Sequence, residues 1–156
     1  MQRYLNDCRR IEEVASTLYQ QLAADKTYHS KVREVFQKLS NDEKEHMLNI
    51  DLLLQANDKD IDVREMIAGE KLNDALVLAE HLLQKVQNEN LNEEKALRLA
   101  VEMEQQFVKV HVDNALYFHD QKLSELFNKL GSEDETHLSI LKECLKWWHA
   151  ERKKML

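Results

Sequence analysis

Two stretches of the sequence decide how this chain folds: residues 35–50, VFQKLSNDEKEHMLNI, and residues 126–141, LFNKLGSEDETHLSIL. Both place an acidic residue three positions before a histidine in the same apolar frame: Glu43 before His46, and Asp134 before His137. Residues three apart share a helix face, so each copy points a carboxylate and an imidazole in one direction. Two such helices facing each other predict a metal site.

The composition of the whole chain is that of an all-α protein. The 156 residues include no proline and only two glycines, 33% are charged, and apolar residues recur every three or four positions. A chain of this length can bury a core without disulfides, so we expect a single domain over residues 1–156. The net charge of −7 argues against nucleic acid or an anionic membrane surface as a partner.

The sequence contains neither a membrane-span pattern nor a cysteine motif. No apolar run approaches the roughly 18 residues of a spanning helix, and the N-terminus lacks a signal-peptide core. We therefore expect no membrane partner and a cytoplasmic location. Cys8 and Cys144 form no Cys-x-x-Cys pair, which excludes a rubredoxin or zinc-knuckle module in this sequence. Each lies on an apolar stripe, so we interpret both as buried free thiols.

The apolar periodicity predicts a four-helix bundle. Helices over residues 2–23 and 30–54, joined by a turn at 25–27, form an antiparallel hairpin. Asn92 can cap the third bundle helix, and a turn near 119–120 leads into the fourth, whose apolar seam runs from Leu123 to Trp148.

The segment over residues 55–90 predicts a long crossover between the second and third bundle helices. It opens with the polar run QANDKDID and holds one short amphipathic helix, over residues 72–86. Such a crossover makes the second and third bundle helices run parallel.

Gly131 and Ser132 leave one ambiguity in the fourth helix. With Glu135 three residues beyond Ser132, they could form a capping box that starts a new helix. The apolar seam keeps its phase across them, so we favour one continuous helix.

Four acids occupy seam positions that should be apolar: Glu12, Glu43, Glu104 and Asp134. An unpaired buried carboxylate is very unfavourable, and two histidines cannot satisfy four of them. Two divalent cations supply four positive charges, so a dinuclear site is the most economical interpretation. Carboxylates and imidazoles without thiolates suit iron or manganese, with zinc possible. The predicted metal ligands are Glu12, Glu43, His46, Glu104, Asp134 and His137.

Some alternatives remain open at these positions. A lone interior glutamate or helical histidine is more often a helix-edge or core residue than a ligand, and it is the duplication that favours a joint site. Glu133, four residues before His137, competes with Asp134 as the ligand. The neighbouring acids are interpreted as solvated faces: Glu13, Glu45, Glu102, Glu133 and Glu135.

The pattern resembles the ferritin-like di-iron carboxylate superfamily, and within it the rubrerythrin-like branch. That family carries a glutamate on the first and third bundle helices and a Glu-x-x-His motif on the second and fourth. Its first-helix motif matches the series Glu12, Ala15, Tyr19 and Ala23, and the third helix repeats it less faithfully as Glu104, Phe107, His111 and Ala115.

The resemblance implies a role for each residue. Glu12 and Glu104 would be terminal ligands, Glu43 and Asp134 would bridge the metals, and His46 and His137 would each bind one. Tyr19 would donate a hydrogen bond to a ligand. His111 stands where tyrosine is commoner, about 10 Å along the helix axis from Glu104, so we expect it behind the ligands or in the core. Asp134 replaces the usual glutamate and shortens that side chain by one methylene.

The resemblance also implies a function: a non-haem di-iron oxidoreductase that reacts with hydrogen peroxide or dioxygen. Two iron ions, a separate electron-donor protein and a homodimer are expected with it, although the third helix lacks the extra carboxylate that rubrerythrins use. One alternative is a ferroxidase or iron-storage protein. Another is a non-enzymatic helical domain with a vestigial site, in which Trp147 and Trp148 could dock a partner, although we favour helix-end packing for them.

Overall fold

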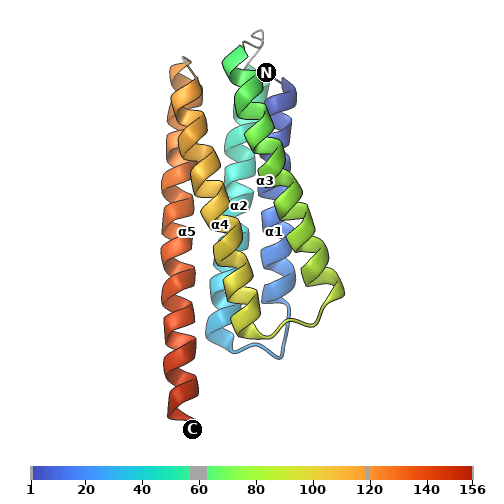
Figure 1. Cartoon of the computed structure of the whole chain (residues 1–156), viewed down its shortest axis with the longest axis vertical. Coiled ribbons are helices and arrows are strands. Elements are labelled where there is room, and N and C mark those ends of the chain that lie inside the picture. The colour runs from blue at the N-terminus through green and yellow to red at the C-terminus, as the bar shows by residue number, and fades with distance from the viewer. Residues whose placement is uncertain (1, 57–62, 119, 156) are drawn as a thin grey trace.

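A computed structural model shows five helices (Figure 1). It describes residues 2–56, 63–118 and 120–155. The helices are α1 (Gln2–Ala23), α2 (Ser30–Ala56), α3 (Val63–Asn88), α4 (Glu93–Tyr117) and α5 (Gln121–Lys154). No strand occurs among these residues, so the predicted all-α class is confirmed. None of the described helices is long and apolar enough to cross a membrane.

The helices form two antiparallel hairpins, and α3 connects them. α1 packs along α2, and α4 packs along α5, whereas α2 and α5 contact each other much less. α3 runs back along the bundle and packs on α1 and α4 (Figure 1). As a result α2 and α4 run in the same direction, as the predicted crossover requires.

The crossover helix is longer than the sequence prediction. We expected a short helix over residues 72–86, but α3 begins at Val63 and spans 26 residues. Its described buried positions, Leu72, Ala75, Ala79 and Leu82, form one narrow stripe that packs on the outside of α1 and α4. Most of the residues that the prediction missed, 63–71, precede the first described buried position, Leu72. Most of the polar run that opens the crossover lies outside the described residues.

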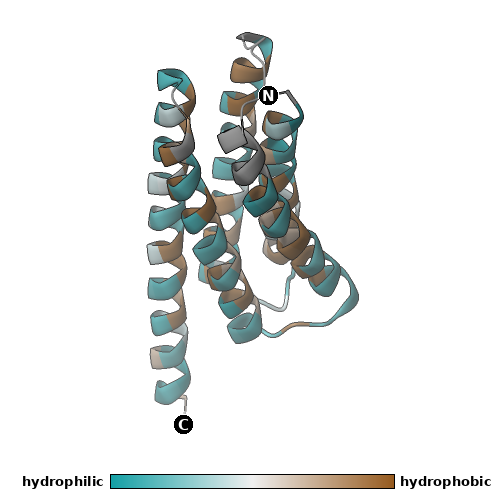
Figure 2. Cartoon of the chain, turned by 45° about the horizontal axis from the view of Figure 1, so that its top comes forward, coloured by the Kyte–Doolittle hydropathy of each residue, from teal (hydrophilic) through white to brown (hydrophobic). Residues whose placement is uncertain are grey.

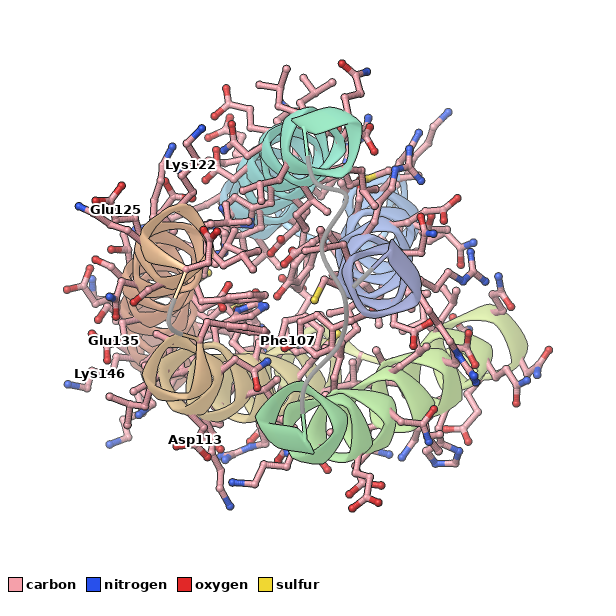
Figure 3. All side chains as sticks on the ribbon, turned by 90° about the horizontal axis from the view of Figure 1, so that it is seen from above. Phe107, Asp113, Lys122, Glu125, Glu135 and Lys146 are labelled. Atoms are coloured by element: carbon pink, nitrogen blue, oxygen red, sulfur yellow. The ribbon has the colours of Figure 1, made fainter. Side chains whose placement is uncertain are left out.

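Buried apolar residues from all five helices form one core, and the hydrophobic positions lie mainly on the inward sides of the ribbons in Figure 2. Figure 3 shows Phe107 pointing into the bundle interior, whereas Asp113 and Glu135 point outward. The predicted cap of α4 is confirmed, because the Asn92 side chain accepts a hydrogen bond from Lys95 N. Asp120 caps α5 in the same way, through Leu123 N.

α5 is one continuous helix through Gly131, so the capping-box alternative is wrong. A Cβ atom at Gly131 would lie 3.1 Å from Val112 Cγ2, so glycine allows α4 and α5 to approach closely here. Cys8 and Cys144 are buried free thiols, as predicted. Trp147 and Trp148 are partly buried against the core, in agreement with helix-end packing.

Candidate metal centre

The six predicted ligands meet inside the bundle. They come from four helices and are all buried: Glu12 on α1, Glu43 and His46 on α2, Glu104 on α4, and Asp134 and His137 on α5. Their donor atoms make two groups, within each of which all atoms lie within 4.8 Å of one another. The three-residue group is Glu12, Glu43 and His46, and the four-residue group is Glu43, Glu104, Asp134 and His137. Among the described residues only Glu43 belongs to both groups, and metal binding itself stays a prediction.

The two histidines turn the same ring nitrogen inward. His46 Nδ1 lies 2.9 Å from Glu43 Oε2 and 3.3 Å from Glu12 Oε2. His137 Nδ1 lies 3.2 Å from Glu43 Oε1 and 3.5 Å from Glu104 Oε1. Glu43 therefore directs one oxygen to each imidazole, as a carboxylate shared between two metal positions must.

The outward ring nitrogens are held by two acids outside the six predicted ligands: Asp42, which sequence reasoning did not assign to the site, and Glu133, which it weighed as an alternative ligand to Asp134. His137 Nε2 hydrogen-bonds Asp42 Oδ2 at 3.1 Å, and His46 Nε2 hydrogen-bonds Glu133. Each acid directly precedes the cluster acid of its own helix, yet each holds the histidine of the other helix. Such outer carboxylates fix the ring orientation and tautomer of a ligating histidine.

The signal for these outer acids was present in the duplicated segment. Asp42 and Glu133 occupy the same position in the two copies, so an acid at both places predicts a shared role. Glu133 belongs to neither donor group, and its side chain is 39% exposed while it contacts His46. It is therefore not simply a solvent-facing acid. Glu135 is exposed, as predicted.

Tyr19 and His111 contact carboxylates of the cluster but belong to neither donor group. The Tyr19 hydroxyl donates a hydrogen bond to Glu104 Oε1 at 2.5 Å. His111 Nδ1 lies 2.5 Å from Asp134 Oδ2, and its Nε2 lies 3.5 Å from Glu12 Oε1. Both residues are completely buried. His111 therefore contacts two of the predicted ligands and is more than a packing residue.

Burial and the neighbouring charges raise the pKa values of several cluster residues, so that without metal these residues retain protons. Burial, followed by repulsion from Glu43, raises the pKa of Glu12 to about 7. Burial alone would lower the pKa of His137, but the nearby carboxylates of Glu104 and Glu43 outweigh it and raise the pKa to about 11. The pKa of His46 is raised in the same way, by Glu12 and Glu43. Metal ions would displace such protons, because ligation requires the deprotonated groups.

A cleft of about 230 Å³ opens at the outer edge of the cluster, on the side where α2 meets α5. It is lined by Lys38, Asp42, Glu45, Glu133, Thr136 and His137. Lys38 Nζ lies 2.6 Å from Asp42 Oδ2. Burial alone would raise the pKa of Asp42, but this contact and the hydrogen bond to His137 together outweigh it and lower the pKa. An anionic carboxylate thus stands beside His137 where small molecules can approach.

Comparison with known families identifies the fold. The family model described as Rubrerythrin matches residues 4–145, a range that includes every residue of both donor groups. The chain belongs to the rubrerythrin family. Neither the search of curated proteins nor the search of solved structures gave a match. The resemblance inferred from the sequence is therefore confirmed at the level of the family.

The cluster fits the two metal ions that membership in the rubrerythrin family implies. Among the described residues, five of its buried donor atoms have no hydrogen-bond partner: Glu12 Oε1, Glu43 Oε1, Glu104 Oε2, Asp134 Oδ1 and His137 Nδ1. A buried polar atom without a partner costs about 1–3 kcal/mol, so these atoms require one. Four carboxylates and two imidazoles suit iron or manganese, with zinc also possible.

Proposed function

We propose that this protein is a non-haem di-iron oxidoreductase that reduces hydrogen peroxide or dioxygen. The observation that carries the proposal is the pair of buried donor groups that overlap at Glu43. Metal positions that share a carboxylate lie close enough to act on one small substrate, as in other two-metal sites with ions about 4 Å apart. Membership in the rubrerythrin family supports the same chemistry.

The residues of the chain orient the ligands and control access. Two ferrous ions held by the two groups would supply the two electrons that reduce the O–O bond of peroxide, with two protons, to two waters. Asp42 and Glu133 keep Nδ1 of both histidines turned toward the carboxylates. Tyr19 holds Glu104 Oε1 through its hydroxyl. The burial of the other ligands limits access by water to the α2–α5 side.

Protons and electrons enter by different means. The cleft reaches His137, whose Nε2 is hydrogen-bonded to Asp42, so this pair links solvent to the cluster and can relay protons. The next turnover requires two further electrons, which we assign to a separate donor protein. A second copy of the chain in a homodimer completes the proposed assembly.

Anaerobic iron titration tests the proposal. Protein freed of metal is titrated with Fe²⁺, bound iron is counted, and one equivalent of hydrogen peroxide is added. We expect two iron ions per chain and the appearance of ferric absorption with consumption of one peroxide per two irons. A chain that binds less than one iron, or whose loaded form shows no spectral change with peroxide, rules out the proposal and favours a vestigial site.

The cleft supports a second candidate, a ferroxidase. Three carboxylates, from Asp42, Glu45 and Glu133, line the cleft that reaches His137, and such a lining also suits the entry of Fe²⁺. The two functions differ in turnover. An oxidoreductase consumes peroxide repeatedly when an electron donor is supplied, and a dimer is expected by size-exclusion chromatography. A ferroxidase accumulates ferric iron without a donor, and a large shell-like oligomer would indicate storage.

A further inference from the structure

The two metal positions implied by the cluster are not equivalent, and His111 is the cause that the geometry singles out. Tyr19 lies seven residues after Glu12 and His111 lies seven residues after Glu104, so the two occupy matching places on α1 and α4. The Tyr19 hydroxyl contacts the terminal acid of the opposite helix, Glu104 Oε1, at 2.5 Å. By symmetry His111 should contact only Glu12.

His111 instead contacts two acids, because an imidazole has two ring nitrogens. Its Nε2 lies 3.5 Å from Glu12 Oε1, the contact that symmetry predicts. Its Nδ1 lies 2.5 Å from Asp134 Oδ2, a closer contact with no counterpart on the other side. A phenol could not make both contacts with one oxygen atom.

The contact changes what Asp134 can offer to metal. Its equivalent, Glu43, directs Oε2 to His46 Nδ1 and Oε1 to His137 Nδ1, and it belongs to both donor groups. Asp134 has Oδ2 engaged by His111, leaving Oδ1 without a hydrogen-bond partner among the described residues. It belongs only to the group of Glu104 and His137.

We propose that His111 confines Asp134 to one metal position and so makes the two positions bind divalent metal with different affinities. The four-residue group fills first, and the three-residue group fills second and more weakly. His111 is a positioning residue in this arrangement, since it acts through Asp134. The inference rests on the proposed dinuclear site, and it departs from the expectation that Asp134 bridges both ions.

Calorimetric and optical titration with Co²⁺ tests this inference. Co²⁺ reports its own ligand environment through visible absorption, so the readout does not depend on catalysis. For the unmodified protein we expect two resolved steps whose affinities differ at least about 10-fold, the lower end of the effect of an outer partner on metal affinity. In His111→Phe, Asp134 Oδ2 is released, and the two affinities should converge to within about 3-fold.

Matched variants separate the cause from a general loss of packing. Tyr19→Phe removes the equivalent hydrogen bond on the other side and should keep two unequal steps. His111→Gln retains an N–H that can reach Asp134 and should also keep them. Circular dichroism shows whether His111→Phe folds. If it does not, the double variant Asp134→Glu with His111→Tyr takes its place and should give the converged affinities, while His111→Gln should still give two unequal steps.

The outcomes distinguish the inference from the proposed function. No Co²⁺ binding to the unmodified protein overturns the dinuclear site itself. Two equal steps leave the site intact and overturn the inequality. Two unequal steps that survive unchanged in His111→Phe overturn the role of His111.

Discussion

The α1–α2 half and the α4–α5 half of the bundle repeat one design but differ at individual positions. Each half supplies a buried acid on its first helix, an acid and a histidine on its second, and an outer acid that holds the histidine of the opposite half. Two of these differences are His111 for Tyr19 and Asp134 for Glu43. They occur together, and in the structure they contact each other.

The comparison shows that the two differences belong together: the shorter side chain of Asp134 is contacted by Nδ1 of His111. Asp134 is one methylene shorter than Glu43, and His111 fills the space between it and Glu12 with a pair of contacts. Because each half holds a histidine of the other half through Asp42 or Glu133, a change in one half is expected to affect the other. The following predictions test where the two halves are equivalent and where they differ.

The largest expected effect is the difference between Glu43→Ala and Asp134→Ala. Glu43 belongs to both donor groups and Asp134 to one. We expect Glu43→Ala to lose tight metal binding at both positions and Asp134→Ala to lose it at one. Each loss should exceed the roughly 10–100-fold cost of removing an outer partner. Metal per chain after dialysis, measured by elemental analysis, checks this, and equal losses in the two variants would show that the halves are equivalent.

The next effect tests the crossing of the outer acids. Asp42→Asn and Glu133→Gln should each weaken metal binding about 10–100-fold, the first through His137 and the second through His46. Glu135→Gln is the control, because Glu135 is exposed and points away from the bundle (Figure 3), and it should leave metal affinity unchanged.

Double variants show which histidine each acid serves. If Asp42 acts through His137, Asp42→Asn should cost nothing further in a His137→Ala background and should keep its full cost in a His46→Ala background. The reverse pattern is expected for Glu133→Gln. Additive costs in both backgrounds would mean that the acids act through overall charge and not through the crossed hydrogen bonds.

A smaller effect is expected on the pH dependence of the protein's stability, to which Glu12 in one half and His111 in the other contribute. Burial raises the pKa of Glu12 from 4.5 to about 7. Burial alone would lower the pKa of His111, but the charge and hydrogen bond of Asp134, together with the charge of Glu12, outweigh it and raise the pKa from 6.5 to about 9. A raised pKa means that the folded state binds more protons, so this stability is present at low pH and lost as pH rises through the folded pKa.

Without metal, the free energy of unfolding should therefore fall between pH 5 and pH 9 (roughly the window set by these two groups), by a few kcal/mol in order of magnitude. Urea unfolding in the presence of a chelator measures it. His111→Phe should make the decline above about pH 7 shallower, because His46 and His137, whose pKa values are also raised, still contribute to it, whereas Tyr19→Phe should retain the full decline. With saturating divalent metal the trend should reverse, because metal competes with protons. A flat profile without metal would contradict the raised pKa values.

The periodicity of the sequence predicted the bundle helices and the six residues of the cluster, because both depend on which residues share a helix face. It predicted α1 correctly, and it predicted that α5 continues past Gly131 because the apolar seam keeps its phase. It underestimated α3, because most of the missed residues, 63–71, precede the described buried stripe that begins at Leu72.

The partners of polar atoms could not be predicted in the same way. Whether His111 reaches Glu12, Asp134 or both depends on side-chain length and on the distance between α4 and α5, and periodicity carries no information on either. Asp42 was missed, and Glu133 was weighed only as an alternative ligand or a solvated acid, for a different reason. Asp42 and Glu133 are partly exposed, and exposed acids on a helix usually face solvent, so only their equivalent places in the duplicated segment could have pointed to them.

The smallest expected effect concerns how each half brings its two helices together. α1 and α2 meet at Ser16 and Ser40, whose hydroxyls each donate to the backbone oxygen of the other residue, at 3.2 Å and 3.0 Å. The residue equivalent to Ser40 in the second half is Gly131, which has no side chain to donate and packs beside Val112. Ser40→Ala should therefore destabilise the protein by about 1 kcal/mol, the net value of one buried hydrogen bond.

Gly131→Ala should instead stabilise the protein by up to about 1 kcal/mol, because glycine is unfavourable in a helix interior. The new Cβ would lie 3.1 Å from Val112 Cγ2, but Val112 is 41% exposed and its side chain can turn toward solvent. Urea unfolding of both variants measures the difference between the halves. If Gly131→Ala is destabilising, adding Val112→Ala decides the cause: recovery would assign the loss to the Val112 side chain. A loss that persists would assign it to the backbone of α4, whose Val112 N lies 3.6 Å from the new atom, and would show that the second half tolerates no increase in helix separation beside His111.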